Sequence, residues 1–238
     1  MAAPKRFFVE NISEEVVLSG EEFRHASQVL RLKVGDEVTL LDGSGTEYSA
    51  VIAKAEKREM TLNVLGSHLS EKEPKTPVTL LFGALKGDKS ELVVQKAVEL
   101  GVSKVGLFLS RFSSVSFGEN KLERLNRVAK EAAKQCLRAR VPEIELYKDL
   151  ESALLSAKDA KNKLFACEFL EESGTSLAGL SGETVLVIGS EGGFSREEYD
   201  EAVRLGYRGV SLGKRILRAE TASIALLSVV MWSLGEWA

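Results

Sequence analysis

Two consecutive strand–loop–helix patterns near the C-terminus constrain the fold of this chain more than any other feature. Thr184–Ile188 is a β-branched, apolar run with the length of a buried strand, and a glycine-rich loop follows it. Ser195 and Glu198 form a capping-box pattern, which predicts that a helix begins there. Val210–Leu212 is a second short strand, and the loop of residues 213–220 leads from it into an apolar helix. Two such units place both loops at one edge of a parallel sheet, where open α/β folds bind ligands.

The first of these loops, G-S-E-G-G at residues 189–193, differs from the familiar nucleotide-binding loops. It lacks both the G-x-G-x-x-G fingerprint of dinucleotide sites and the G-x-x-x-x-G-K-[ST] phosphate loop. Glu191 places a carboxylate just before a helix N-terminus, where it would repel a phosphate. A neutral or cationic ligand fits this charge better, and S-adenosylmethionine carries a sulfonium and an ammonium. The alternative is that Glu191 only stabilises the N-terminus of the helix.

The two loop motifs resemble those of a known family. I-G-S-E-G-G at 188–193 and L-G-K-R-I-L-R-A-E-T-A at 212–222 resemble the paired C-terminal motifs of the RsmE-type 16S ribosomal RNA uridine-N3 methyltransferases. These enzymes belong to the SPOUT class, so the resemblance implies an α/β parallel sheet whose deep trefoil knot binds S-adenosyl-L-methionine in a bent shape. Ser190 stands where the family usually has proline, and Ala219 stands where threonine is common. The resemblance covers nearly the whole chain.

The resemblance also implies a function and an assembly state. The function is methylation of N3 of a specific uridine in 16S rRNA, with naked RNA and the assembled small ribosomal subunit both open as substrates. The alternative is a non-catalytic RNA-binding ribosome-assembly factor that keeps the methyltransferase fold. The family forms homodimers around its C-terminal helix, and the segment 222–234 is apolar on most of its circumference. The alternative is that this helix is buried wholly within one subunit.

Candidate site residues lie in the same two motifs. Arg218 is expected to stabilise the anion that forms when uridine N3 loses its proton, while Glu220 orients the uridine or accepts the proton. Glu191 is an alternative proton acceptor, and a purely structural ion pair between Arg218 and Glu220 is a second interpretation. The residues predicted to bind the cofactor are Cys167, Ile188, Gly189, Ser190, Glu191, Gly192, Gly193, Leu212, Gly213, Ile216 and Leu217.

The first 70 residues have a different pattern. Several short predicted strands and one helix, Glu21–Leu30, favour a small barrel. A charged linker with two prolines, residues 71–77, separates this region from the alternating β/α pattern. We therefore predict two domains, residues 1–72 and 73–238, and the resemblance implies that the first is a PUA-like, RNA-binding β-barrel.

Basic residues suggest where RNA would bind. The net charge of −3 gives no overall signal for nucleic acid, so an RNA footprint must be a local patch. The segment 120–140 predicts an amphipathic helix with a basic stripe beside its apolar face. Such stripes are most often only solvated, but the flanking segments match family patterns, which favours phosphate contacts. The predicted RNA-binding residues are Arg6, Arg24, Arg31, Arg111, Arg124, Arg127, Lys134, Arg138 and Arg140.

Other classes of protein are disfavoured by the composition. Cys136 and Cys167 match no metal or redox spacing, so we expect no bound metal. His25 and His68 are the only two histidines, which argues against a histidine-dependent triad. The apolar stretch 222–234 is too short to span a membrane, and the N-terminus lacks the apolar core of a signal peptide. We therefore expect a soluble, cytoplasmic protein with no membrane partner.

Overall fold

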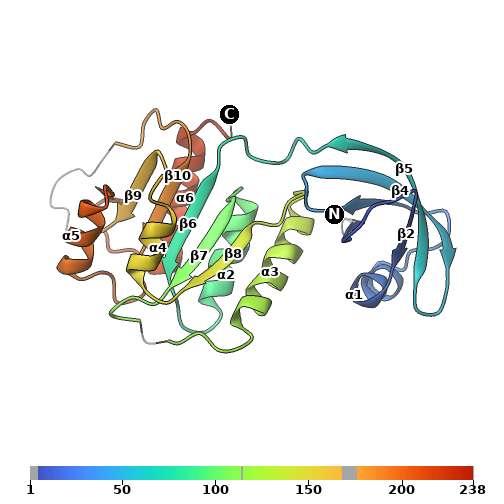
Figure 1. Cartoon of the computed structure of the whole chain (residues 1–238), viewed down its shortest axis with the longest axis horizontal. Coiled ribbons are helices and arrows are strands. Elements are labelled where there is room, and N and C mark those ends of the chain that lie inside the picture. Colours follow the sequence, from blue (N-terminus) through green and yellow to red (C-terminus); the bar gives the residue numbers. More distant parts are fainter. Residues whose placement is uncertain (1–4, 114, 168–175, 238) are drawn as a thin grey trace. The chain divides into compact units, whose positions relative to one another are not determined.

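The structure, a computed structural model, describes residues 5–113, 115–167 and 176–237 (Figure 1). Within these ranges, no helix combines the length and the apolar character that crossing a membrane requires. The same ranges contain no group of three or more His, Cys, Asp or Glu side chains placed to hold a metal ion.

Contacts divide the chain into two compact units. The N-terminal unit comprises Met1–Glu73 and Ala133–Val141, and the C-terminal unit comprises Pro74–Ala132 and Pro142–Ala238. The sequence predicted a single boundary between residues 72 and 73. The sequence carried no sign that the later segment Ala133–Val141 also belongs to the N-terminal unit.

Glu73 explains why that segment joins the N-terminal unit. Its Oε1 accepts hydrogen bonds from the backbone N–H groups of Ala139, at 2.8 Å, and Arg140, at 2.9 Å. Its Oε2 accepts a hydrogen bond from the Arg138 guanidinium at 2.9 Å. Arg138 is only 4% exposed, so this is a buried charge pair, and removing one partner would leave an uncompensated charge.

The N-terminal unit is a curled, five-stranded sheet. Its strands are β1 (Arg6–Phe8), β2 (Glu15–Leu18), β3 (Glu37–Leu41), β4 (Thr46–Ala55) and β5 (Met60–Leu69). They lie in the order β1-β3-β4-β5-β2, with β1 parallel to β3 and the other pairs antiparallel. Two register shifts between β4 and β5 bend this long pair, as Figure 1 shows. The predicted barrel is thus a curled sheet, because β1 and β2 remain its edges in the pairing of the described residues.

The predicted helix Glu21–Leu30 is two successive elements. The structure has α1 (Gly20–Arg24), which passes directly into a π-helical turn, η1 (His25–Val29). The Leu30 N–H donates to the His25 carbonyl at 3.0 Å, the i→i+5 bond of a π turn.

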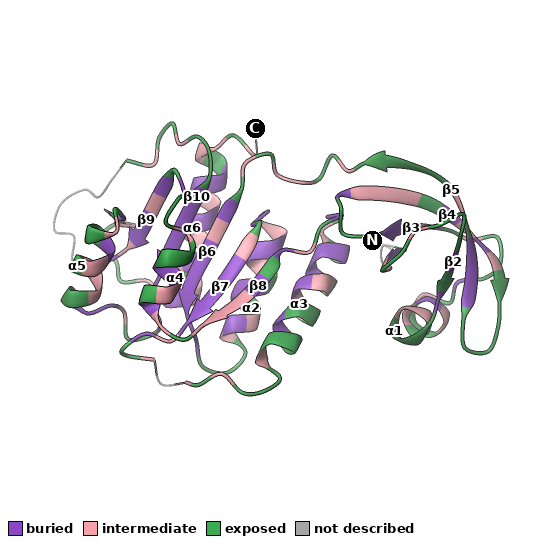
Figure 2. Ribbon diagram, in the orientation of Figure 1, coloured by how far each residue is buried: buried purple, intermediate pink, exposed green. Residues whose placement is uncertain are grey.

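The C-terminal unit is an α/β sheet in which every strand pair is parallel, as predicted. Its strands are β6 (Val78–Gly83), β7 (Lys104–Phe108), β8 (Glu143–Tyr147), β9 (Asn162–Ala166), β10 (Thr184–Ile188) and β11 (Arg208–Val210). They lie in the order β11-β9-β10-β6-β7-β8. All five residues of β10 are buried, as expected for an apolar run between two neighbouring strands (Figure 2).

Helices cover this sheet. They are α2 (Lys89–Glu99), α3 (Lys121–Gln135), α4 (Leu150–Ser156), α5 (Arg196–Arg204) and α6 (Ala219–Ser233). α6 packs against α2, β6 and β10, whereas α4 packs against β7 and β8. The predicted capping box begins α5: the Ser195 hydroxyl accepts from the Glu198 N–H at 3.2 Å, and Glu198 Oε2 accepts from the Ser195 N–H at 2.8 Å.

Three predicted boundaries near the sheet edge shift. The strand predicted at Val210–Leu212 ends at Val210, so residues 211 and 212 belong to the loop. The last helix begins at Ala219 rather than at Thr221, because the extended backbone of Arg218 ends the loop one residue before it. Glu220 therefore lies in the first turn of α6 and not in the loop. The segment 163–169 also reads as a strand from its sequence, but β9 ends at Ala166, and residues 168 and 169 lie outside the described part of the chain.

Candidate functional site

A cavity of about 780 Å³ opens at the edge of the parallel sheet where β9, β10 and β11 end. The loops that follow these three strands form its wall, together with the starts of α2 and α6. All of the residues predicted to bind the cofactor line this one cavity, and so does Arg218. The other lining residues are Lys89, Ala166, Phe194, Val210, Ser211, Lys214, Arg215, Ala219 and Ala222.

The loop after β10 is shaped by close backbone packing. The Gly193 N–H donates to the Ser190 carbonyl at 3.0 Å, and this turn brings Gly193 back over Gly189. A Cβ atom on Gly189 would lie 3.1 Å from the backbone of Gly193, and Gly193 itself has a φ of +66°. Side chains at these two positions would therefore distort the turn, so the glycines leave the loop backbone open to a ligand.

Ser190 is held by a hydroxyl hydrogen bond. Its side chain is buried, and its Oγ lies 3.0 Å from the Oγ of Ser110, which in turn lies 3.0 Å from the Oγ of Ser113. A proline at this position would fix its backbone torsion φ, which serine does not do. The hydroxyl pair is a different constraint on the same position, and it ties the loop to the segment after β7.

Replacing Ser190 with alanine is expected to lower the free energy of unfolding by about 1 kcal/mol, because the buried hydroxyl of Ser110 loses one of its two hydroxyl partners and keeps Ser113. Urea unfolding of the full chain measures this change. Ser103→Ala, at an exposed serine of the same unit, is the control. An equal effect of the two substitutions would contradict a stabilising role for the buried pair.

Lys89 lies between two carboxylates at the cavity wall. Its Nζ is 3.3 Å from Oε1 of Glu191 and 3.8 Å from Oε1 of Glu220. The backbone N–H of Lys86 also donates to Glu191 Oε1, at 3.1 Å. Burial raises the pKa of Glu191, but the hydrogen bonds from Lys86, from its own N–H and from Lys89 outweigh burial and lower that pKa overall. Glu191 is therefore a charged group and a weak proton acceptor.

Glu220 does not line the cavity. Its side chain is 14% exposed, and its Oε2 is buried with no hydrogen-bond partner among the described residues. Because its other oxygen faces Lys89, the interpretation of Arg218 and Glu220 as an ion pair is wrong. Arg218 is exposed, and in the described part of the chain its guanidinium forms no ion pair.

The sequence analysis missed Lys89. It lies in a polar segment, 86–90, that reads as a solvated turn when it is considered alone. The signal was topological: this segment follows β6, which pairs with β10, so its loop reaches the same edge of the sheet.

Three of the predicted RNA-binding residues are buried in ion pairs, which corrects their assignment. Arg6 pairs with Glu47 at 2.8 Å, and Lys134 pairs with Glu22 at 2.9 Å. Arg6, Lys134 and Arg138 are 7%, 5% and 4% exposed, so they have little surface for a phosphate. The hydrogen bond from Arg6, which outweighs burial, lowers the pKa of the Glu47 carboxyl and keeps that pair charged.

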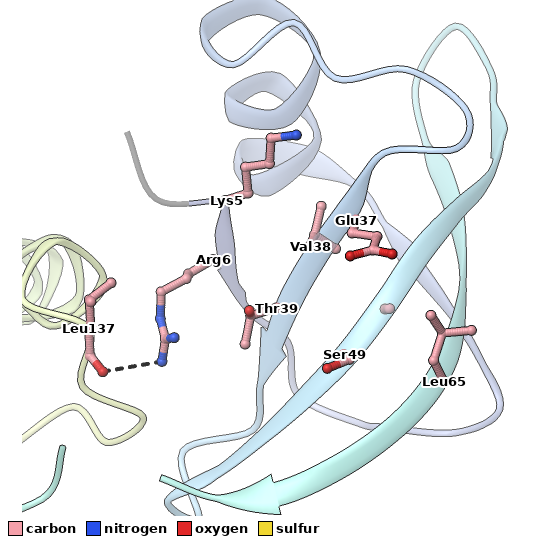
Figure 3. Close-up of a pocket in the computed structure, with 9 residues that line it drawn as sticks. Lys5, Arg6, Glu37, Val38, Thr39, Ser49, Leu65 and Leu137 are labelled. Atoms are coloured by element: carbon pink, nitrogen blue, oxygen red, sulfur yellow. Dashed lines mark hydrogen bonds between the residues drawn. The ribbon is translucent and has the colours of Figure 1, made fainter. Parts of the chain in front are cut away.

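A second pocket, of about 500 Å³, explains how Arg6 is enclosed (Figure 3). It lies within the N-terminal unit and is lined by residues of β1, β3 and β4 and by Leu137. The Arg6 guanidinium donates to the Leu137 carbonyl at 3.3 Å, the dashed line in Figure 3. Leu137 has a φ of +67°, which a leucine rarely adopts, so this carbonyl is presented by an unusual backbone turn. The contacts of the Arg6 side chain therefore lie within the N-terminal unit.

The remaining predicted arginines are exposed. Arg24 and Arg31 lie on the N-terminal unit, where Arg140 donates to the Ser44 carbonyl at 2.7 Å. On the C-terminal unit, Arg111 lies 3.4 Å from Glu197 and Arg124 lies 2.6 Å from Glu91. Arg127 lies 3.3 Å from Glu123 on the same helix. Exposed ion pairs of this kind are weak, so these side chains can exchange a carboxylate for a phosphate. Their contact with RNA stays a prediction.

Comparisons with known proteins match both units. A family model described as RNA methyltransferase domain matches residues 71–231, and one described as RNA methyltransferase PUA domain matches residues 18–65. Ribosomal RNA small subunit methyltransferase E of Mesomycoplasma hyopneumoniae (strain 232) is 33% identical over 232 residues, which cover 94% of this chain and 97% of that protein. The protein of the same name from Synechocystis sp. (strain PCC 6803) is 30% identical, over 92% of this chain and 73% of that protein.

A solved structure is similar over the same extent. The crystal structure of a ribosomal RNA small subunit methyltransferase E from Neisseria gonorrhoeae, bound to S-adenosyl methionine, has a TM-score of 0.91 and 28% sequence identity. The match covers 99% of this chain and 100% of that chain. Together these matches confirm the resemblance that the two C-terminal motifs indicated, and they confirm that the N-terminal sheet is of the PUA type.

Proposed function

Since the chain belongs to the family of ribosomal RNA small subunit methyltransferase E, we propose that it methylates N3 of a specific uridine in 16S rRNA with S-adenosylmethionine as the methyl donor. The observation that carries the proposal is the single cavity at the sheet edge, which both C-terminal motifs line. A ribosomal RNA substrate places this activity in the cytoplasm.

The cavity fits the proposed cofactor in shape and in charge. The glycine turn exposes backbone groups, and Ile188, Leu212 and Leu217 provide apolar contact for an adenine ring. Glu191 provides a carboxylate that stays charged, which suits a ligand with two positive centres. Oε2 of Glu220, close to this wall, is a buried hydrogen-bond acceptor, and no donor among the described residues reaches it.

The chemistry requires an anion to meet a cation. S-adenosylmethionine, when bound, supplies a methyl group on a positively charged sulfur. N3 of uridine is a weakly acidic imide, so it becomes nucleophilic when its proton passes to water or to a carboxylate and negative charge spreads over O2 and O4. A positive group close to these oxygens favours that anion, most of all where water is excluded.

Arg218 is the residue that we assign to this task. It lines the cavity, its side chain is exposed, and it forms no ion pair within the described ranges that would engage its charge. Glu191 is better suited to hold a positive charge than to accept the proton, because its pKa is lowered. Glu220 does not line the cavity, and among the described residues its ion pair with Lys89 is what connects it to the cavity wall.

The direct test is transfer of a labelled methyl group from S-adenosylmethionine to small ribosomal subunits that lack the modification, with naked 16S rRNA in parallel. We expect 3-methyluridine at one position, and the substrate that reacts faster identifies the natural form. Cofactor binding without transfer to either substrate would instead favour the non-catalytic assembly factor.

We also propose that the chain forms a homodimer through α6. Val229 and Trp232 lie three residues apart on this helix, and their side chains are 43% and 66% exposed. Large apolar side chains at neighbouring exposed positions are typical of a surface that a partner covers. The trefoil knot remains a prediction from the resemblance.

Replacing Trp232 with glutamate is expected to convert the dimer to a monomer, because a charge would be buried in the apolar interface. Light scattering coupled to size-exclusion chromatography measures the molecular mass. Val203→Glu changes an apolar residue that is 47% exposed on α5, and this control should stay dimeric. A monomeric wild-type chain, or a dimeric Trp232→Glu variant, would contradict the proposed interface.

A further inference from the structure

The cluster of Lys89, Glu191 and Glu220 has an arrangement that neither motif accounts for. One ammonium lies within 4 Å of one oxygen of each carboxylate, at 3.3 Å and 3.8 Å. The three groups come from different parts of the chain: the first turn of α2, the loop after β10 and the first turn of α6. Lys89 and Glu191 line the cavity, whereas Glu220 lies behind them.

Each carboxylate uses its Oε1 in this arrangement. For Glu191, Oε1 also accepts the Lys86 N–H at 3.1 Å, so Lys86 and Lys89 meet the same oxygen. For Glu220, Oε1 faces Lys89, and the buried Oε2 has no donor among the described residues. A buried carboxylate oxygen without a donor is uncommon in a folded protein, so the Lys89 ammonium at Oε1 is the contact on which this carboxylate depends among the described residues.

We propose that Lys89 is a positioning residue of the methyl-transfer site, which bridges Glu191 and Glu220 and so holds the Glu191 carboxylate in place at the cavity wall. This inference rests on the proposed function. Without Lys89, two carboxylates would share the wall with no cation between them, and their repulsion would displace one side chain or protonate it.

The surrounding charges do not replace Lys89. The other charged side chains that line the cavity are Lys214, Arg215 and Arg218, all on the loop after β11. None of the three forms an ion pair with either carboxylate in the described part of the chain, and Arg218 is assigned to the uracil anion. Lys89 is therefore the cation that separates the two acids.

The test compares Lys89→Met with Lys89→Arg in the full chain. The matched control is Lys96→Met, because Lys96 lies two turns further along α2 and pairs only with Glu99, at 2.8 Å. Calorimetry measures S-adenosylmethionine binding between about pH 3.5 and pH 7.5, a range that begins below the ordinary pKa of a glutamate carboxyl. Single-turnover methyl transfer to unmodified small ribosomal subunits is measured on the same preparations.

Lys89→Met is expected to slow single-turnover transfer about 100-fold, the size of effect that misplaced site groups produce. The fall of cofactor binding at acid pH should begin about one unit higher, since a carboxylate that loses its cation is protonated more readily. Lys89→Arg should restore most of both properties, and Lys96→Met should match the wild-type chain. A side chain that is 35% exposed tolerates these changes, and Lys89→Gln gives the same test if Lys89→Met does not fold.

The role of Lys89 would be overturned if Lys89→Met transferred methyl groups at the wild-type rate and if its cofactor binding fell at the same acid pH as that of the wild-type chain. The proposed function would then still stand. No methyl transfer by the wild-type chain would count against the function instead. The calorimetric comparison would then still decide whether Lys89 governs the ionisation of the two carboxylates.

Discussion

Replacing Arg218 with alanine is expected to lower the rate of methyl transfer about 100- to 1,000-fold, the usual effect of removing one group that stabilises charge in a transition state. Affinity for S-adenosylmethionine should change little, because the uracil anion forms only during the reaction. The fold should also be unaffected: Arg218 caps α6 with its backbone carbonyl, which accepts the Ala222 N–H at 2.8 Å, and alanine keeps that carbonyl. Single-turnover kinetics at saturating cofactor measure the rate.

Arg208→Ala is the control for this experiment, since Arg208 is exposed at the start of β11, just before the same loop. A tenfold or greater weakening of cofactor binding in Arg218→Ala, equivalent to about 1.4 kcal/mol, would show that Arg218 binds the cofactor instead. If Arg218→Ala and Glu220→Gln both kept near-normal turnover in a folded chain, the catalytic assignment of these two residues would be abandoned.

Replacing Gly83 with alanine is expected to damage the cofactor site from outside the cavity. Gly83 ends β6, and a Cβ atom there would lie 2.5 Å from the backbone nitrogen of Ser190 and 2.9 Å from its Cα. Backbone atoms cannot rotate away as a side chain would, so the loop after β10 must move. We expect the free energy of unfolding to fall by about 1–3 kcal/mol, the usual cost of overpacking. Cofactor affinity should fall about tenfold or more, which corresponds to a loss of about 1.4 kcal/mol.

Urea unfolding and calorimetry measure these two effects, with Gly118→Ala as the control, since a Cβ atom on Gly118 meets nothing within 4 Å. Wild-type cofactor affinity in Gly83→Ala would mean that the loop position is not set by its contact with β6. The ligand itself would then impose the geometry of the loop.

Much of the fold was predictable because its signals are local. Thr184–Ile188 is an apolar β-branched run, and it is a buried strand with the predicted bounds. Ser195 and Glu198 lie three residues apart, so their reciprocal cap needs no other part of the chain. Gly189 meets the backbone of Gly193, four residues on, so that part of the loop is also a local signal, whereas Gly192 is packed against Phe112 from the segment after β7.

The basic residues show where this reasoning fails. Helical periodicity placed Lys134 on a solvated stripe, but Glu22 pairs with it from 112 positions away. Arg138 meets Glu73 across 65 positions, and Arg6 meets Glu47 across 41. A pattern on one helix contains no information about a carboxylate elsewhere in the chain, so burial of these charges was not foreseeable.

The sequence by itself determined the family, the parallel α/β sheet and the two loops that line the cavity, because each depends on motifs whose parts lie within a few turns of the chain. Only the tertiary structure decided which charged groups face each other. It placed Lys89 between Glu191 and Glu220, and it separated Glu220 from Arg218, two residues away in sequence. The physical reason is that electrostatic contacts depend on distance in space, and the order of strands in the sheet sets that distance.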